Sequence, residues 1–163
     1  QVGLACRSGE LVDVFGGSIL RRYFPCTPAP TPPIAALIGI DLKVAAFRAS
    51  LQHLASQAHA GCVGYGAAER TAVTLGLAPS LLDAIDRIYD ANRLLVGRNL
   101  AGTRLRICHR DDLYSTHPPA VLLFAISNQH EIFADWKNHL PGSTLVAVVG
   151  QDLSFKPLSD FTC

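Results

Sequence analysis

The sequence predicts an α/β fold in which helices cover both faces of a mostly parallel sheet. Short apolar segments alternate with helical patterns from residue 34 onward, the order of crossover units that join parallel strands. Residues 60–90 read as apolar strand, glycine turn, helix, second strand and terminal acid. The chain has 163 residues, 49% of them hydrophobic and 17% charged, which is enough for one globular core. These observations indicate a Rossmann-like three-layer domain over residues 34–163, preceded by a short β-ribbon and a long helix.

Charge and composition exclude several classes of function. A net charge of +1 gives no reason to expect nucleic acid or a membrane surface as a partner. The apolar runs are short, so we expect no membrane span, and the N-terminus lacks the layout of a signal peptide. The five cysteines stand singly, so we expect no metal site and a cytoplasmic protein with reduced thiols. The absence of methionine suggests a processed chain or a piece of a longer one.

The first 33 residues are predicted to form a β-ribbon and a linker. Residues 4–6 and 11–15 are strand candidates around a turn at 7–10, and residues 19–24 are another after Gly16-Gly17. We therefore place the ribbon at residues 1–24. Residues 25–33 contain five prolines in nine positions, which predicts an extended linker between two units.

A long helix is predicted over residues 34–59. Apolar residues recur every three or four positions on one stripe, including Leu37, Phe47 and Leu51, and polar residues take the other faces. One interpretation is that the stripe packs on the sheet. The other is a seam with a partner helix, because the narrow stripe is close to a coiled-coil pattern, and this would give a homodimer through residues 37–58.

The predicted βαβ unit of residues 60–90 has the order of a nucleotide-binding turn. A buried strand runs into Gly64-Tyr65-Gly66-Ala67, a helix follows over 69–76, and a second strand over 85–89 ends at Asp90. Glycines let backbone N–H groups approach a phosphate, and an acid after the second strand can hold a ribose hydroxyl. Glu69 replaces the third glycine of the full fingerprint, so a simple tight turn is the alternative. For Asp90 the alternative is a turn that it caps toward Asn92.

The remaining elements continue the alternation. Strands are expected at 104–108, 120–126 and 144–149, a helical turn at 109–114, and a helix from about 129 to 139 capped by Ser127 or Asn128. Residues 151–163 show no pattern. Sites in such sheets lie outside the carboxyl ends of the strands. The polar residues expected there are Asp90, Asn92, His109, Ser127, Asn128, His130 and Glu131.

Four of the side chains near these strand ends are candidates for acid–base catalysis. His109 with Asp111 has the pattern of a general base and an orienting acid, although a surface turn also explains it. His130 and Glu131 begin the last helix, where a glutamate is favoured by the helix dipole alone. Ser127 lacks the Gly-x-Ser-x-Gly elbow of a nucleophile, so we favour capping for it.

Several short motifs, in order and spacing, resemble SAM-dependent C-methyltransferases. Gly16-Gly17-Ser18-Ile19-Leu20-Arg21 is similar to the ribbon that ends their catalytic domain, and Val63-Gly64-Tyr65-Gly66-Ala67-Ala68 resembles the loop that opens their C-terminal domain. Asp90-Ala91-Asn92, the run from Gly97 to Thr103, and Asn128 with Glu131-Ile132 resemble later segments of that domain. The resemblance covers about residues 12–149. Phe15 stands where the family has a histidine, and Glu69-Arg70 replaces a Lys-Gly pair.

The resemblance implies a Rossmann-like domain that binds the acceptor substrate, often a nucleotide-linked keto-sugar, or a carrier-linked intermediate. SAM and the catalytic base would belong to a companion methyltransferase domain, so no cofactor is expected in this chain. Gly64, Tyr65, Gly66, Ala67, Asp90 and Asn128 would face the acceptor, with Asn92 and Ser127 nearby. The alternative is a free-standing biosynthetic isomerase, cyclase or lyase on this scaffold, with His109, Asp111, His130 and Glu131 as its acid–base groups.

Overall fold

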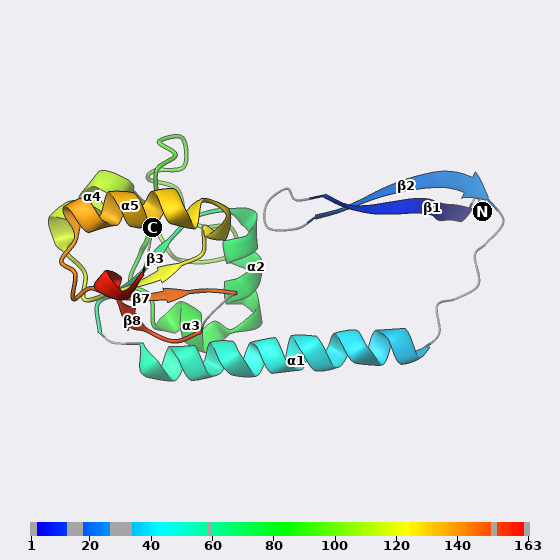
Figure 1. Cartoon of the computed structure of the whole chain (residues 1–163), viewed down its shortest axis with the longest axis horizontal. Helices are drawn as coiled ribbons and strands as arrows, with labels where there is room; N and C mark the ends of the chain where they lie inside the picture. Colours follow the sequence, from blue (N-terminus) through cyan, green and yellow to red (C-terminus); the bar gives the residue numbers. More distant parts are fainter. Residues whose placement is uncertain (1–2, 13–17, 27–33, 59, 151–152, 162–163) are drawn as a thin grey trace. The chain divides into compact units, whose positions relative to one another are not determined.

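The computed structural model describes residues 3–12, 18–26, 34–58, 60–150 and 153–161, with side chains described from residue 41 onward (Figure 1). The chain divides into two compact units, residues 1–45 and 46–163. Helix α1 (Ile34–Gln57) contributes to both units. Residues 27–33, most of the predicted linker, lie outside the described residues.

Unit 1 contains an antiparallel hairpin of β1 (Gly3–Val12) and β2 (Ser18–Cys26). The predicted ribbon is therefore present, but the turn expected at residues 7–10 is wrong. Strand β1 continues through this segment, because a bulge between Cys6 and Ser8 absorbs one extra residue without ending the pairing. The expected turn at Gly16-Gly17 lies outside the described residues.

Unit 2 is built on a six-stranded sheet with the order β5-β4-β3-β6-β7-β8. The pairs among β3 (Cys62–Tyr65), β4 (Ile88–Asp90), β5 (Ile107–His109), β6 (Ala120–Leu123) and β7 (Leu145–Val148) are all parallel. This is the 3-2-1-4-5 order of a doubly wound fold, and β3 and β6 lie at its switch point. The predicted fold class is confirmed.

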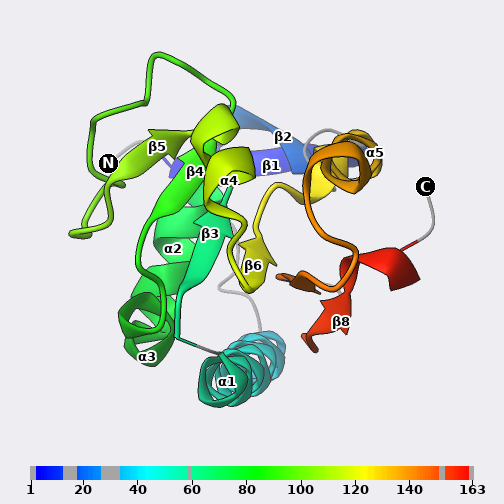
Figure 2. The same ribbon diagram turned by 90° about the vertical axis from the view of Figure 1, so that its left-hand side faces the viewer.

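Side chains alternate between two cores, one on each face of the sheet. Cys62, Leu122 and Ala147 pack with Leu51 and Leu54 of α1 and with the helices α2 (Glu69–Leu77) and α3 (Pro79–Asp83). The other core combines the alternate strand positions with α4 (Arg110–Thr116) and α5 (Gln129–His139) (Figure 2). This period of two explains why the strands read as continuous apolar runs, since both of their faces are buried.

The structure shifts several predicted boundaries and adds four short elements that the sequence analysis did not predict. Strand β4 begins at Ile88 rather than 85, because α3 and the turn after it occupy the preceding residues. Strand β6 ends at Leu123, and residues 126–128 form a 3₁₀ turn before α5. The tail, which shows no sequence pattern, supplies the short edge strand β8 (Lys156–Pro157), antiparallel to β7, and a second 3₁₀ turn (Leu158–Asp160).

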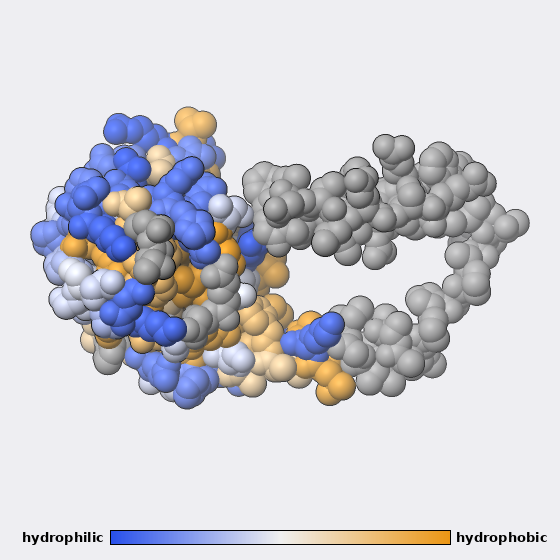
Figure 3. Space-filling model, in the orientation of Figure 1, coloured by the Kyte–Doolittle hydropathy of each residue, from blue (hydrophilic) through white to orange (hydrophobic). Residues whose placement is uncertain are grey.

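Helix α1 matches the prediction of a long helix but is buried over only part of its length. Leu51 and Leu54 are fully buried in unit 2, whereas Leu42 is 67% exposed and Val44 is 40% exposed. Figure 3 accordingly shows hydrophobic side chains on the surface of this helix. The packing interpretation therefore holds for residues 47–58. Within the described residues, no helix is both long enough and apolar enough to cross a membrane.

Candidate functional site

A pocket of about 260 Å³ lies where the carboxyl ends of β3, β4 and β6 meet. The sheet order creates it, because the connections from β3 and β6 leave toward opposite faces at the switch point. Helices α4 and α5 supply the rest of its wall. Its lining residues are Tyr65, Gly66, Asp90, Ala91, Arg110, Ala125, Asn128, Glu131, Ile132 and Asp135.

Hydrogen bonds to Tyr89 and Asp90 of β4 hold the glycine turn after β3 in place. The Gly66 N–H donates to the Tyr89 carbonyl (N···O 2.8 Å), and the Ala67 N–H donates to Asp90 Oδ2 (2.7 Å). Gly66 has φ +99°, and a Cβ there would lie 2.9 Å from the Cβ of Ala125. The turn therefore requires glycine for its conformation and packing, and two of its N–H groups are already engaged.

The carboxylate of Asp90 also fixes the loop that follows β4. Its Oδ1 accepts from the Asn92 N–H (2.7 Å), and Asn92 Oδ1 accepts from the Leu94 N–H (3.0 Å). The cap toward Asn92 that the sequence offered as an alternative is thus present. Asp90 lines the pocket while each of its oxygens already holds one backbone group.

Arg110 brings the cation to a pocket otherwise rich in carboxylates. Its Nη1 lies 3.7 Å from Asp135 Oδ2, and its Nε lies 3.6 Å from Asp111 Oδ1. Nε is buried and has no hydrogen-bond partner among the described residues. Asp135 is held in turn by the Tyr114 hydroxyl, which donates to its Oδ2, and it lies 3.4 Å from His139 Nδ1. This network joins α4 to α5 beside the pocket.

Tyr65 forms the floor of the pocket at the end of β3. It is 5% exposed and packs edge-on against Trp136, with ring centroids 5.1 Å apart. Burial raises the pKa of the Tyr65 hydroxyl to about 12, although the nearby Arg110 acts in the opposite direction. The hydroxyl therefore stays protonated at neutral pH and can donate a hydrogen bond to a carbonyl or hydroxyl oxygen.

The structure places five of the twelve candidate site residues in the lining of the pocket. These are Tyr65, Gly66, Asp90, Asn128 and Glu131. Gly64 is buried within β3, where a Cβ would lie 3.2 Å from Ile88, and Ala67 faces the other side of the turn. Asn92 and Ser127 are exposed near the mouth. Asn128 holds the N-cap position of α5 but makes no capping hydrogen bond with its side chain, so the predicted side-chain cap is wrong.

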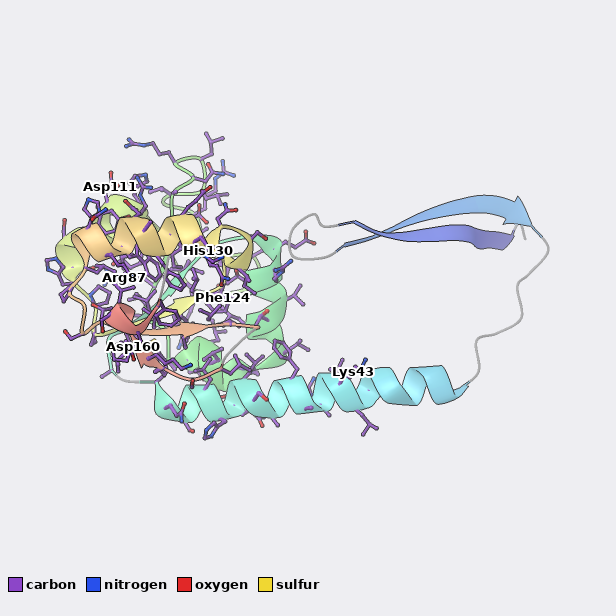
Figure 4. The ribbon with its side chains drawn as sticks, in the orientation of Figure 1. Lys43, Arg87, Asp111, Phe124, His130 and Asp160 are labelled. Carbon is purple, nitrogen blue, oxygen red and sulfur yellow. The ribbon has the colours of Figure 1, made fainter. Side chains whose placement is uncertain are left out.

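The four side chains proposed as acid–base groups do not all line the pocket. His109 Nδ1 lies 3.2 Å from Asp111 Oδ2 and 3.3 Å from the Asp111 backbone nitrogen, so this pair is close, as the sequence suggested. Figure 4 shows Asp111 on α4 and His130 on the first turn of α5. Of the four, Glu131 alone is in the described lining of the pocket.

Sequence reasoning missed Arg110 and Asp135. Two features of the sequence could have indicated these residues. Arg110 ends a segment, residues 91–110, that holds five arginines and no acidic residue. Asp135 is four residues after Glu131, so the two share one face of α5 with Asn128 and Ile132.

The backbone groups and the carboxylate at the ends of β3 and β4 are hydrogen-bonded to one another within the protein. Within the residues that the structure describes, no three His, Cys, Asp or Glu side chains are grouped as metal ligands.

Comparison with known proteins gives one match. Residues 39–149 match the family model described as C-methyltransferase C-terminal domain, which is more than half of the chain. The match includes every lining residue of the pocket. A search of curated proteins finds no match.

Proposed function

Because the chain belongs to the C-methyltransferase C-terminal domain family, we propose that it binds the methyl acceptor in the pocket at Tyr65, Asp90 and Asn128. One observation supports this most strongly. The pocket lies at the topological switch point of the sheet, and its donors and acceptors come from the ends of three adjacent strands and two helices.

The lining favours an uncharged, hydroxyl-rich ring. Ligand pockets usually measure roughly 300–1,000 Å³, so 260 Å³ suits one ring rather than a whole nucleotide. Three carboxylates, Asp90, Glu131 and Asp135, face one guanidinium, that of Arg110. Carboxylates accept hydrogen bonds from hydroxyl groups but repel phosphates, and the Arg110 and Tyr65 donors suit a carbonyl oxygen.

The acceptor that we propose is a sugar, such as a keto-sugar linked to a nucleotide, or a carrier-linked intermediate of natural-product biosynthesis. The domain holds the reacting ring, and a companion methyltransferase domain supplies SAM and the catalytic base. One feature supports this division, since the sequence contains no Asp-x-Gly-x-Gly-x-Gly loop.

The alternative, a free-standing isomerase, cyclase or lyase, would need its acid–base groups around one substrate. His109 and His130 do not line the pocket that Glu131 lines. The distribution of these side chains therefore favours the acceptor-binding proposal. A homodimer through α1 remains a prediction, and sedimentation at several protein concentrations tests it.

Calorimetry with the full chain tests the acceptor-binding role. The titrants are a nucleoside-diphosphate hexose and, separately, SAM. Asn128→Ala removes an exposed amide from the pocket, and we expect it to weaken hexose binding about tenfold. Asn138→Ala is the matched control, because Asn138 is exposed on the same helix and its side chain bonds only to the Ala134 carbonyl in the described structure.

We expect saturable binding of the hexose and no binding of SAM. Asn128→Ala should weaken hexose binding, and Asn138→Ala should leave it unchanged. Tight binding of SAM would contradict the proposal. So would equal affinity of the two asparagine variants for the hexose.

A further inference from the structure

The guanidinium group of Arg110 lines the pocket without forming a hydrogen bond within the described residues. Its neighbouring carboxylates are those of Asp135, 3.7 Å from Nη1, and Asp111, 3.6 Å from Nε. Both distances are longer than those of hydrogen bonds, and Nε is nevertheless buried. A buried donor without an acceptor is unfavourable, so the donors of this cation are available to a molecule that enters the pocket.

Asp135 and Tyr114 hold the Arg110 guanidinium from two sides. Arg110 Nη1 lies near Asp135 Oδ2, and the Tyr114 hydroxyl donates a hydrogen bond to the same oxygen. Arg110 and Tyr114 are four residues apart on α4, so their side chains lie on one face of that helix. The guanidinium carbon is 5.9 Å from the centre of the Tyr114 ring, which adds a cation–π attraction.

His139 completes this cluster from the neighbouring helix. It follows Asp135 by four residues on α5, and its Nδ1 lies 2.8 Å from the Asp135 carbonyl oxygen and 3.4 Å from Asp135 Oδ1. Its ring stacks on that of Tyr114, with centroids 4.4 Å apart and planes inclined by 14°. Burial and the hydrogen bond to Asp135 raise the pKa of Tyr114, so its hydroxyl stays a donor at neutral pH.

The cluster is therefore a support on which Arg110 is placed before a ligand arrives. Arg110 and Asp135 line the pocket, whereas Tyr114 and His139 are outside its described lining. A long side chain that is already ordered loses less conformational entropy when a ligand binds. A guanidinium has donors and no acceptor, so a fixed Arg110 selects an oxygen atom that can accept a hydrogen bond.

We propose that Asp135 is a positioning residue, which holds the Arg110 guanidinium where it donates hydrogen bonds to an oxygen atom of the bound ring. Tyr114 fixes the Asp135 carboxylate, and His139 fixes the Tyr114 ring. This inference rests on the proposed function, because it takes this pocket to hold the acceptor.

The inference also assigns different roles to the three carboxylates of the pocket. Asp90 accepts hydrogen bonds from two backbone N–H groups, and Asp135 faces Arg110. Glu131 is exposed and forms no hydrogen bond or ion pair within the described residues. Glu131 is therefore the carboxylate that remains to accept a hydrogen bond from a ring hydroxyl.

A double-mutant cycle in the full chain tests the proposal, with calorimetric titration of uridine-diphosphate glucose as the measurement. Arg110→Ala is expected to weaken binding about tenfold, because it removes a charge-assisted hydrogen bond. Asp135→Asn removes the charge that holds the guanidinium, and it is expected to weaken binding about fivefold. In the Arg110→Ala background, Asp135→Asn is expected to change the affinity less than about twofold, because no guanidinium is left to position.

Asp112→Asn is the matched control for the loss of one negative charge. Asp112 is exposed on α4, is outside the described lining of the pocket and forms no ion pair within the described residues. Its replacement is expected to change the affinity less than about twofold.

The Nε–H signal of Arg110 in the NMR spectrum of the nitrogen-15-labelled chain gives a second readout. Its loss in Arg110→Lys assigns the signal. Because Nε is buried, its hydrogen is expected to exchange slowly with water in the parent chain and in Asp112→Asn. In Asp135→Asn the exchange is expected to be at least about tenfold faster, since the guanidinium is no longer held.

The outcomes separate this inference from the proposed function. Equal weakening by Asp135→Asn in the parent and in the Arg110→Ala background overturns the inference, because Asp135 then acts without Arg110. Unchanged hexose binding in Asp135→Asn overturns it as well. If urea unfolding shows that Asp135→Asn does not fold, Tyr114→Phe takes its place in the cycle under the same criteria. None of these results affects acceptor binding, whereas a parent chain without saturable hexose binding contradicts the proposed function itself.

Discussion

The Asp90 carboxylate accepts hydrogen bonds from the N–H groups of Ala67 and Asn92, so one side chain fixes two loops that border the pocket. An acid at the end of the second strand is the residue that a nucleotide-binding fingerprint assigns to a ribose hydroxyl. In this chain its visible partners are backbone groups. Asp90 therefore fixes the position of the glycine turn.

The first residue-scale prediction concerns the stability that Asp90 provides. Asp90→Ala leaves two N–H groups without their acceptor and is expected to lower the free energy of unfolding by about 2–4 kcal/mol. Asp86→Ala, an exposed aspartate four residues earlier, is expected to change it by less than about 0.5 kcal/mol. Urea unfolding of the two variants measures both values. Equal, small effects would show that the two hydrogen bonds do not hold the loops.

The second residue-scale prediction concerns alkaline pH. Burial raises the pKa of Tyr65 to about 12, whereas an unfolded tyrosine titrates near 10. Between these values the folded state keeps a proton that the unfolded state loses, so stability is complete below pH 10 and falls as the pH rises toward 12. The raised pKa values of Tyr114 and Cys62 add to the fall.

Replacing Tyr65 by phenylalanine removes the part of this loss of stability that comes from the Tyr65 hydroxyl. Between pH 10 and 11 we expect the loss of unfolding free energy to be smaller by about 1 kcal/mol in Tyr65→Phe than in the parent chain. Urea unfolding at the two pH values gives the comparison. Parallel losses in the two proteins would mean that Tyr65 titrates as an exposed tyrosine does.

Sequence reasoning located lining residues of the pocket where a topological rule applied, and it missed those whose positions depend on side-chain contacts. Tyr65, Asn128 and Glu131 come together because strand ends converge at the switch point, which the order of elements foretells. Arg110 and Asp135 join them through helix faces. Their places depend on the registration of α4 against α5, which a single sequence does not specify.

At the scale of elements, helices and strands were predicted where they are long enough to show a period of apolar residues. The stripe on α1 and the runs in β3, β6 and β7 are long enough to define a helix or a buried strand. Helix α3 has five residues and β8 has two, so neither carries a period. Strand β8 exists because it pairs with β7, a contact between segments that only the folded chain brings together.

The element-scale prediction uses the uneven burial of α1. Leu54 is fully buried, so Leu54→Ala is expected to lower the free energy of unfolding of unit 2 by about 2–5 kcal/mol. Leu42→Ala is the matched control on the same helix. Leu42 is 67% exposed, and its truncation is expected to cost less than about 0.5 kcal/mol. A large effect of Leu42→Ala in the isolated chain would indicate a partner for that face, such as a second copy.

At the scale of the whole molecule, the order of the strands explains where the pocket lies. A doubly wound sheet provides a crevice at its switch point whether or not its glycine turn binds a nucleotide. Here the glycine turn is hydrogen-bonded to Asp90 and Tyr89, and the pocket lies at the ends of β3, β4 and β6. Family membership is shown by the match over residues 39–149, and the division of labour with a companion domain is our proposal.

A crystal structure of the chain with a nucleoside-diphosphate hexose would show directly whether this pocket holds the acceptor. We expect electron density for the hexose against Tyr65, Arg110 and Asn128, within the pocket at the ends of β3, β4 and β6. Density for the hexose at another site, with this pocket filled by the protein's own side chains, would contradict this expectation.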